Sequence, residues 1–305
     1  MLNLRLSKHK PITLTTKEAK IMNKNIYKEV TEKVLQHMQD NGTDWTKPFK
    51  AMAVNGMPSN YATGNSYNGI NVLLLGIAGY SSNQWGSYKQ WQAKGGTVKK
   101  GSKGTMIVFY KVISKTNKTT GEESNFPLLR YSTVFNASQI DGITFPAIVP
   151  KTSLIDAISL VDDYIIKTEA DIRQVPDNAY YVPSLDYIGM PDKEAFIDTE
   201  YSNATENYYA TLLHELTHWT GAKHRLARTK SNMFGDKDYA FEELIAELGS
   251  AFQCASLGIS SSPRIDHAKY LNNWMKALKE DDKVIMKAAS QAQKAVKFIE
   301  ELQAA

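Results

Sequence analysis

Two histidines four residues apart, with a glutamate directly after the first, constrain this chain more than any other feature. They are His214, Glu215 and His218, in the segment His-Glu-Leu-Thr-His. On an α-helix, residues four apart lie on one face, so both imidazoles can reach one metal ion. Glu215 can then take a proton from a water held at that metal, as in metal-dependent hydrolases. Because leucines and a tryptophan flank the segment, it predicts a buried helix that binds metal.

A catalytic zinc site needs a third protein ligand, and two residues compete for that place. His224 completes the spacing His-Glu-x-x-His-x-x-Gly-x-x-His, which is the metzincin pattern. Glu243 lies in a later helical segment, where Glu247 shares its face and could orient a ligand imidazole. Aliphatic neighbours indicate that this helix is largely buried, and unpaired buried carboxylates are costly. We favour Glu243, because His224 lies in a cationic run that would oppose a dication, and Met233 follows too soon for a metzincin methionine turn.

The formal net charge of +4 hides an unequal distribution along the chain. Residues 1–150 carry 19 Lys and Arg against 8 Asp and Glu, whereas residues 151–305 carry 17 against 24. Between Asp44 and Glu122 there are ten lysines and no acidic residue. A surface that only keeps a protein soluble mixes both signs. The imbalance of charge therefore predicts that the first half binds a polyanion.

The acid-free segment contains a glycine-rich turn with lysines, and aromatic residues lie around it. Backbone N–H groups and lysines can dock phosphates there, although the spacing is not that of a phosphate-binding P-loop. Aromatic rings beside a basic groove favour single-stranded DNA over duplex with little sequence preference, and we expect this of residues 25–140. Each ring taken singly could equally belong to the core. The residues predicted to contact DNA are Lys94, Lys99, Lys100, Lys103, Tyr67, Trp85 and Tyr110.

The hydrophobic pattern predicts two folded units, since 305 residues can bury two cores. The predicted divisions are a leader at 1–24, a DNA-binding unit at 25–142, a linker at 143–152 and a second unit at 153–305. The single cysteine excludes an internal disulfide. Because the chain shows no signal peptide and no apolar run of membrane-spanning length, we expect a cytoplasmic protein with no membrane partner.

Periodicity and turn residues predict an α+β fold: a mixed α/β first unit and a mostly helical second unit with a small sheet. Helices are expected over residues 26–41, 70–77, 82–93, 154–166, 206–220 and 239–257, with two more at the C-terminal end. Strands are expected over residues 105–113, 129–136, 179–182 and 186–190. We expect the last of these strands to be an edge strand that borders the metal site and can pair with an extended peptide.

The motifs of the chain are similar to those of a known family. Segments in the first half resemble the single-strand-DNA-binding domain of ArdC-type antirestriction proteins, which are related to plasmid TraC primases. These segments are residues 65–71, 85–91, 95–101 and 134–140. Residues 208–221 and 239–249 resemble the zincin metallopeptidase domain of the same family. The resemblance covers about residues 25–260.

The resemblance implies a protein of a plasmid, phage or integrated element that binds incoming single-stranded DNA and helps it survive host restriction. It also implies Zn²⁺ or another divalent metal, held by His214, His218 and Glu243, with Glu215 as catalytic base. It does not supply a peptidase substrate. Two functions therefore stay open: a protein that shields DNA by coating it, and a DNA-targeted metalloprotease whose main activity is hydrolysis of a host or DNA-bound protein.

Overall fold

The computed structural model describes residues 16–116, 123–145, 154–200, 202–228, 237–260 and 267–304. The helices of the first half are α1 (Thr16–Asn41), α2 (Pro48–Asn55), α3 (Ile70–Ile77) and α4 (Tyr88–Ala93). Its strands are β1 (Ser59–Asn60), β2 (Gln84–Gly86), β3 (Thr97–Val98), β4 (Thr105–Thr116), β5 (Glu123–Asn136) and β6 (Ile140–Asp141). The helices of the second half are α5 (Leu154–Ile166), α6 (Ala204–Trp219), α7 (Lys237–Leu257), α8 (His267–Glu280) and α9 (Val284–Leu302). Its strands are β7 (Asp171–Gln174), β8 (Tyr180–Val182) and β9 (Tyr187–Met190).

Helix α1 follows the predicted four-residue repeat of apolar side chains. Ile26, Val30, Val34 and Met38 are all buried, as one face of a helix against a core requires. The helix begins at Thr16, so residues 16–24 of the predicted leader are helical, and the boundary of the leader stays a prediction. The rest of that leader, residues 1–15, lies outside the described part of the chain.

The first half contains a four-stranded sheet in the order β1-β2-β5-β4, and one of its strands corrects a predicted helix. The segment expected to be helical over residues 82–93 is strand β2 followed by the short helix α4. Trp85 pairs with Asn136 of β5, and its indole packs in the core beneath the sheet. Helix α4 begins only after Ser87, whose hydroxyl accepts from the backbone N–H of Gln90.

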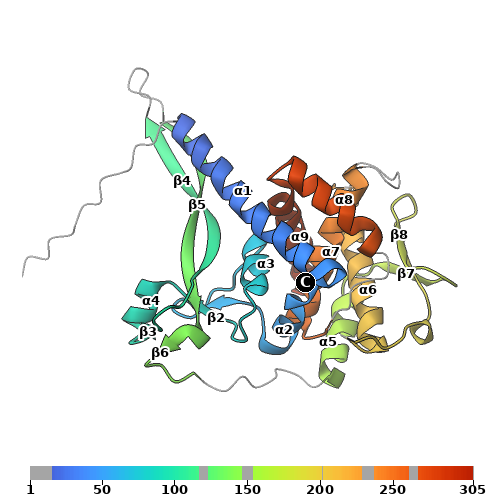
Figure 1. Cartoon of the computed structure of the whole chain (residues 1–305). Helices are drawn as coiled ribbons and strands as arrows, with labels where there is room; N and C mark the ends of the chain where they lie inside the picture. Colours follow the sequence, from blue (N-terminus) through green and yellow to red (C-terminus); the bar gives the residue numbers. More distant parts are fainter. Residues whose placement is uncertain are drawn as a thin grey trace, which may run out of the picture.

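Strands β4 and β5 form a long antiparallel hairpin, as predicted, whose pairing runs from Thr105 opposite Val134 to Thr116 opposite Glu123. Figure 1 shows this hairpin beside α1, with α7, α8 and α9 on the other side of that helix. Asn71 of α3 holds β4 in place, because its amide exchanges two 2.8 Å hydrogen bonds with the backbone of Val108.

A three-stranded sheet in the second half has the order β7-β9-β8. Strand β9 is central, with β7 parallel on one side and β8 antiparallel on the other, so the predicted edge strand is wrong. Strand β7 escaped prediction because its four residues include a single apolar side chain, Ile172. The edges of this sheet are therefore β7 and β8.

The two halves of the chain share one large core. Trp45 lies edge-on to Trp274 of α8, with 6.1 Å between ring centroids, and Phe49 of α2 contacts Phe252 of α7 at 5.7 Å. The same cluster includes buried residues of α1, α3, β4, β5 and α9. A second core joins α5, α6 and β9. The halves are thus packed together through α7, α8 and α9 (Figure 1).

Three remaining predictions concern the linker, the cysteine and the membrane. Most of the linker predicted at 143–152 lies outside the described residues, so its boundaries stay a prediction. Cys254 is buried on α7 without a disulfide partner. Among the described helices, none combines the length and the apolar character needed to cross a bilayer.

Candidate functional site

Helix α6 carries the two histidines in its C-terminal half, and its N-terminal turn is capped. Asn203 caps the helix: its side chain accepts from the N–H of Glu206, whose carboxylate accepts from the N–H of Asn203. The apolar face that follows is buried, and His214 and Glu215 are buried with it, at 4% and 3% exposure. The helix predicted from the His-Glu-x-x-His spacing therefore forms, and it faces the interior.

A close crossing of α6 and α7 places the second helix against the histidines. Gly249 of α7 allows it, because a Cβ there would lie 2.5 Å from Cγ2 of Thr217. Gln253 of α7 donates to the carbonyl oxygen of Leu213 at 3.2 Å and to the hydroxyl of Thr217 at 2.9 Å. The hydroxyl of Ser250 donates to a backbone carbonyl of α6. This contact fixes where the carboxylates of α7 stand relative to the imidazoles.

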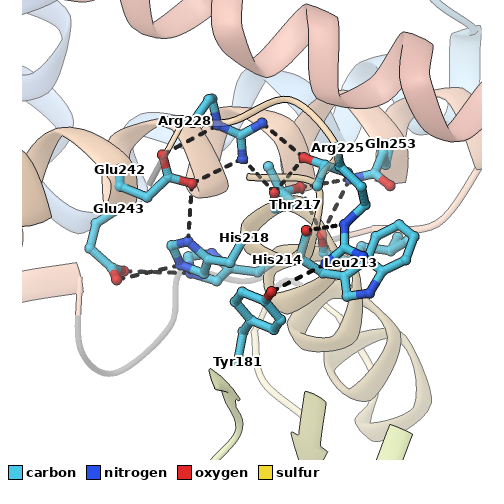
Figure 2. A network of polar contacts seen from close by, with 12 residues as sticks. Tyr181, Leu213, His214, Thr217, His218, Arg225, Arg228, Glu242, Glu243 and Gln253 are labelled. Carbon is cyan, nitrogen blue, oxygen red and sulfur yellow. Dashed lines mark hydrogen bonds and ion pairs between the residues drawn. The ribbon is translucent and has the colours of Figure 1, made fainter. Parts of the chain in front are cut away.

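His214, His218 and Glu243 converge as the sequence predicts (Figure 2). Their separations are 3.2 Å between the two Nε2 atoms, 3.4 Å from His218 Nε2 to Glu243 Oε1 and 3.5 Å from His214 Nε2 to Glu243 Oε2. Ligand atoms about 2.0–2.1 Å from a tetrahedral centre lie about 3.3–3.4 Å apart. Donor types and spacing therefore fit a zinc-like divalent ion.

Each imidazole also faces a second carboxylate on its other nitrogen. Glu247 Oε2 lies 3.8 Å from Nδ1 of His214, in the position predicted for an orienting residue. Glu242 Oε1 lies 3.4 Å from Nδ1 of His218, a role that the sequence did not reveal. The Glu242 carboxylate is close enough to hold the imidazole of His218 in the orientation that directs Nε2 toward a metal, whereas Glu247 is an ion-pair neighbour of His214 beyond hydrogen-bond distance.

The charges of this cluster are strongly coupled. Burial disfavours a charged His218, but the carboxylates of Glu243 and Glu242 outweigh burial and raise the pKa of His218 to about 10. Burial likewise opposes a charged Glu243, but His218 and His214 hold the pKa of that carboxyl well below its usual range. A buried carboxylate cluster of this kind needs positive charge, which a divalent ion supplies.

His224 lies outside the group of three ligands. Its side chain is 63% exposed, and its Nε2 is 3.3 Å from the carboxylate of Asp186. The expectation that the surrounding cationic run opposes a metal is incomplete, because its arginines are paired: Arg225 with Asp186, and Arg228 with Glu242 at 2.9 Å. Met233, considered for a methionine turn, lies outside the described residues.

Glu215, predicted to be the base, lies in the same buried region. Its negative charge contributes to the raised pKa of His218, which places the carboxylate near the ligand imidazoles. Base catalysis by Glu215 stays a prediction.

The four lysines predicted to bind DNA are exposed, and they lie on or near the turn between α4 and β4. Strands β3 and β6 pair antiparallel and anchor this turn. Lys99 Nζ donates to the carbonyl oxygen of Ser138 at 2.9 Å, and the backbone oxygen of Lys103 accepts from Gln139. The backbone of the turn is thereby held in place while Lys94, Lys100 and Lys103 project their charges to solvent.

The three predicted aromatic contacts differ in exposure. Trp85 is 2% exposed and cannot stack on a base while the core is closed, so the structure corrects that assignment. Tyr67 packs partly buried against the same cluster, and its hydroxyl accepts from Asn60. Tyr110 is 57% exposed and stays available.

Further exposed rings lie near these lysines and on the hairpin, and sequence reasoning missed those of Phe109 and Tyr131. Tyr88 of α4 is 53% exposed, and Phe109 of β4 and Tyr131 of β5 are 45% and 58% exposed. The alternation that would mark these rings is interrupted, since Phe109 and Tyr110 are exposed side by side in β4 and Leu128 and Leu129 are buried side by side in β5.

Comparison with known proteins gives consistent matches over both halves. A family model described as the N-terminal domain of anti-restriction factor ArdC matches residues 24–135, and one described as a zincin-like metallopeptidase matches residues 159–291. Uncharacterized protein y4eC of Sinorhizobium fredii is 37% identical over 282 residues, covering 88% of this chain and 89% of that protein. A DNA primase TraC of Escherichia coli is 36% identical over 90% of this chain. The match covers only 27% of that primase.

Two solved structures share this fold along most of the chain. The crystal structure of metal-free antirestriction protein ArdC from plasmid R388 has a TM-score of 0.77 and 40% identity. The structural match covers 92% of this chain and 98% of the ArdC chain. The Mn(II)-bound structure of the same protein has a TM-score of 0.73 and 38% identity, with the same coverage. Both halves of this chain therefore match one protein, in which the corresponding halves follow in the same order.

Proposed function

This chain belongs to the ArdC antirestriction family, and from that premise we propose that it protects the single-stranded DNA of a mobile element against host restriction. The first half binds the strand, and the second half carries a metal-dependent peptidase-like site. Two features of the same chain carry the proposal. One is the exposed lysine turn within the segment that has no acidic residue, and the other is the buried centre of three metal ligands.

The lysine turn supplies a binding mode that depends little on sequence. Lysines neutralise phosphates and release counterions, and this contribution is the same for every base. Exposed rings on the hairpin, such as Tyr110 and Tyr131, can stack on unpaired bases, which a duplex does not offer. Binding should therefore favour single strands and weaken steeply as salt rises.

The second half has the groups of a hydrolase. His214, His218 and Glu243 would hold the metal, and when bound, a divalent cation polarises a scissile carbonyl and lowers the pKa of a coordinated water. Glu242 keeps the imidazole of His218 oriented, since its carboxylate lies against the Nδ1 atom. Glu215 takes the proton of the attacking water and passes it to the leaving amine.

An alternative function is favoured by the intact Glu215. A metal with a purely structural role needs no buried base beside its ligands, so hydrolysis of a host or DNA-bound protein could be the main activity. DNA binding would then bring this site to its substrate. The two functions differ in whether protection of DNA requires the base.

One experiment separates these functions. Unmodified plasmid DNA enters a restricting host that produces the wild type, Glu215→Gln, or a variant with glutamine at Lys99, Lys100 and Lys103, and surviving transformants are counted. Glutamine at position 215 keeps the volume of a buried side chain while removing the base. We expect the lysine variant to lose protection and Glu215→Gln to retain most of it.

Two controls make the outcome interpretable. Metal content of purified Glu215→Gln should equal that of the wild type, because the ligands are untouched. A matched charge control replaces Lys28, Lys33 and Lys47, three exposed lysines of the same half that pair with neighbouring carboxylates. Loss of protection in Glu215→Gln at full metal content would instead make proteolysis the mechanism. Loss in the charge control would refute a specific role for the turn.

A further inference from the structure

A cavity of about 470 Å³ lies where the hairpin meets helices α1, α3 and α9. Its lining includes Tyr27 of α1, Phe109 and Tyr110 of β4, and three lysines at the start and along the length of α9. Its volume is within the range of about 300–1,000 Å³ that is usual for ligand sites. The residues of the metal centre do not line it. It is therefore a second site, built from both halves of the chain.

Hydrogen bonds hold the walls of this cavity together. The backbone N–H of Gly69 donates to Oε1 of Gln293 on α9 at 3.0 Å, which joins the loop before α3 to the second half. Gly69 has a φ of +55°, a left-handed conformation that side-chain-bearing residues rarely adopt. The hydroxyls of Tyr27 and Tyr110 lie 2.8 Å apart across the cavity rim. The shape is thus fixed by contacts between α1, β4, α3 and α9.

The α9 wall is unusually basic for its half of the chain. From Lys283 to Ile299 there are four lysines and no acidic residue, although residues 151–305 carry more acidic than basic residues. Three of these lysines, at positions 283, 287 and 294, line the cavity and are exposed. Spacings of four and seven residues keep them on one face of the helix. Lys283 Nζ lies 5.6 Å from the centre of the Tyr27 ring, and Lys287 lies 3.2 Å from an oxygen of Asp281.

This cavity combines the groups that contact a nucleotide. Lysines bind phosphates, the exposed ring of Tyr110 on the face of the hairpin toward Tyr27 offers a face to a base, and amide side chains such as Asn68 and Gln291 can hydrogen-bond base edges. The lysine turn lies close along the chain, since six residues from Lys103 to Phe109 span at most about 20 Å. About six nucleotides at 3.4 Å each cover that distance.

We propose that this cavity binds a nucleotide of the same single-stranded DNA that occupies the lysine turn, with the α9 lysines on its phosphates. The proposal rests on the proposed function of the first half. It adds that α9, a helix of the metal-binding half, is part of the DNA-binding surface. One strand then contacts both halves of the chain, and the first half alone presents an incomplete site.

The test uses full-length protein and a fluorescent single-stranded oligonucleotide of about 15 nucleotides, titrated at several salt concentrations. The cavity variant replaces the three lining lysines with glutamine: Lys283, Lys287 and Lys294. The matched control replaces three exposed lysines of α8 and α9 that do not line the cavity: Lys276, Lys279 and Lys297. A third variant, Tyr110→Leu, tests the ring that faces Tyr27 across the cavity. A fourth replaces the lysines of the turn.

Counterion release gives the expected size of the effect. Each lost phosphate contact on a single strand reduces the slope of log K against log salt by about 0.7, equivalent to about fivefold in affinity at 0.1 M salt. The cavity variant should therefore bind about 100-fold more weakly, with a slope smaller by about 2. Tyr110→Leu should lose at least about fivefold, the lower end for one stacked base. The control should stay within about twofold of the wild type.

Three other outcomes would overturn the inference, and they are distinguishable. Wild-type affinity and slope in the cavity variant, with loss in the turn variant, leave the proposed function standing and remove the cavity from it. Equal loss in the control shows that only the overall charge of the helices matters. If the wild type does not bind single-stranded DNA at low salt, both the proposed function and the cavity proposal are wrong.

Discussion

Glu242 has two partners at the metal centre, and Glu242→Gln should affect metal affinity and folding stability by separate routes. Its carboxylate lies 3.4 Å from Nδ1 of His218 and 2.9 Å from Nη2 of Arg228 (Figure 2). An amide oxygen can still accept from the imidazole, but more weakly than a carboxylate, and it leaves the guanidinium without a counter-charge. The variant therefore holds the imidazole of His218 less firmly and leaves the buried guanidinium of Arg228 without its counter-charge.

The two effects have different expected sizes. Loss of the carboxylate behind a ligand imidazole lowers metal affinity about 10- to 100-fold, which is about 1.4–2.7 kcal/mol. Removing one partner of a buried ion pair costs about 3–5 kcal/mol of stability. Arg228 is 5% exposed but keeps hydrogen bonds to the carbonyl oxygen of Thr217 and the hydroxyl of Thr220. We therefore expect the lower end, about 3 kcal/mol.

A double variant separates the two effects. Arg228→Met added to Glu242→Gln removes the uncovered charge, so it should recover most of the lost stability without recovering metal affinity. Urea unfolding in the presence of a chelator measures the stability, and competition with a chromophoric chelator measures the metal affinity. Wild-type metal affinity in Glu242→Gln would refute the orienting role of this carboxylate. Equal stability of the single and double variants would refute the role of charge in holding Arg228.

Three further outcomes test the centre and the packing around it. Glu243→Gln should lose most of its bound metal during dialysis, whereas His224→Gln should retain it, by elemental analysis; the reverse pattern contradicts the choice of third ligand. Gly249→Ala should lower the free energy of unfolding by about 1–3 kcal/mol, because its Cβ would lie 2.5 Å from Cγ2 of Thr217; an unchanged urea midpoint contradicts the close helix crossing. At a free metal concentration 100 times the dissociation constant of the metal, removing the metal should lower the free energy of unfolding by about 2.7 kcal/mol. A melting temperature that does not change when chelator is added contradicts a bound ion.

The metal centre was predictable to the extent that its geometry is local. Positions four apart on a helix must share a face, so His214 and His218 could be paired from sequence alone. Glu243 was inferred from a second helix of the same character. The role of Glu242 depends on the angle at which α6 and α7 cross and on an arginine from the segment between them. Neither leaves a pattern in the sequence.

The aromatic residues show the opposite case, in which a local pattern misled. The residues around Trp85 are compatible with a helix, but pairing with β1 and β5 makes this segment a strand and buries the indole. Strand pairing is a long-range interaction that overrides weak local preference. The exposed ring of Tyr131 lies on a strand whose alternation is interrupted, because Leu128 and Leu129 are buried side by side.

The asymmetry of charge follows the division between the two matched family models, but it does not reveal that the two halves share a core. The four-residue repeat of α1 shows which side chains are buried and says nothing about their partners. In the folded chain, Trp45 and Phe49 of the first half are covered by Trp274 and Phe252 of the second. Exposing such a side chain costs about 1.5–3 kcal/mol. A fragment of residues 25–140 would uncover both and also lose the α9 wall of the cavity, so the expectation that this fragment binds DNA by itself conflicts with the packing that supports its surface.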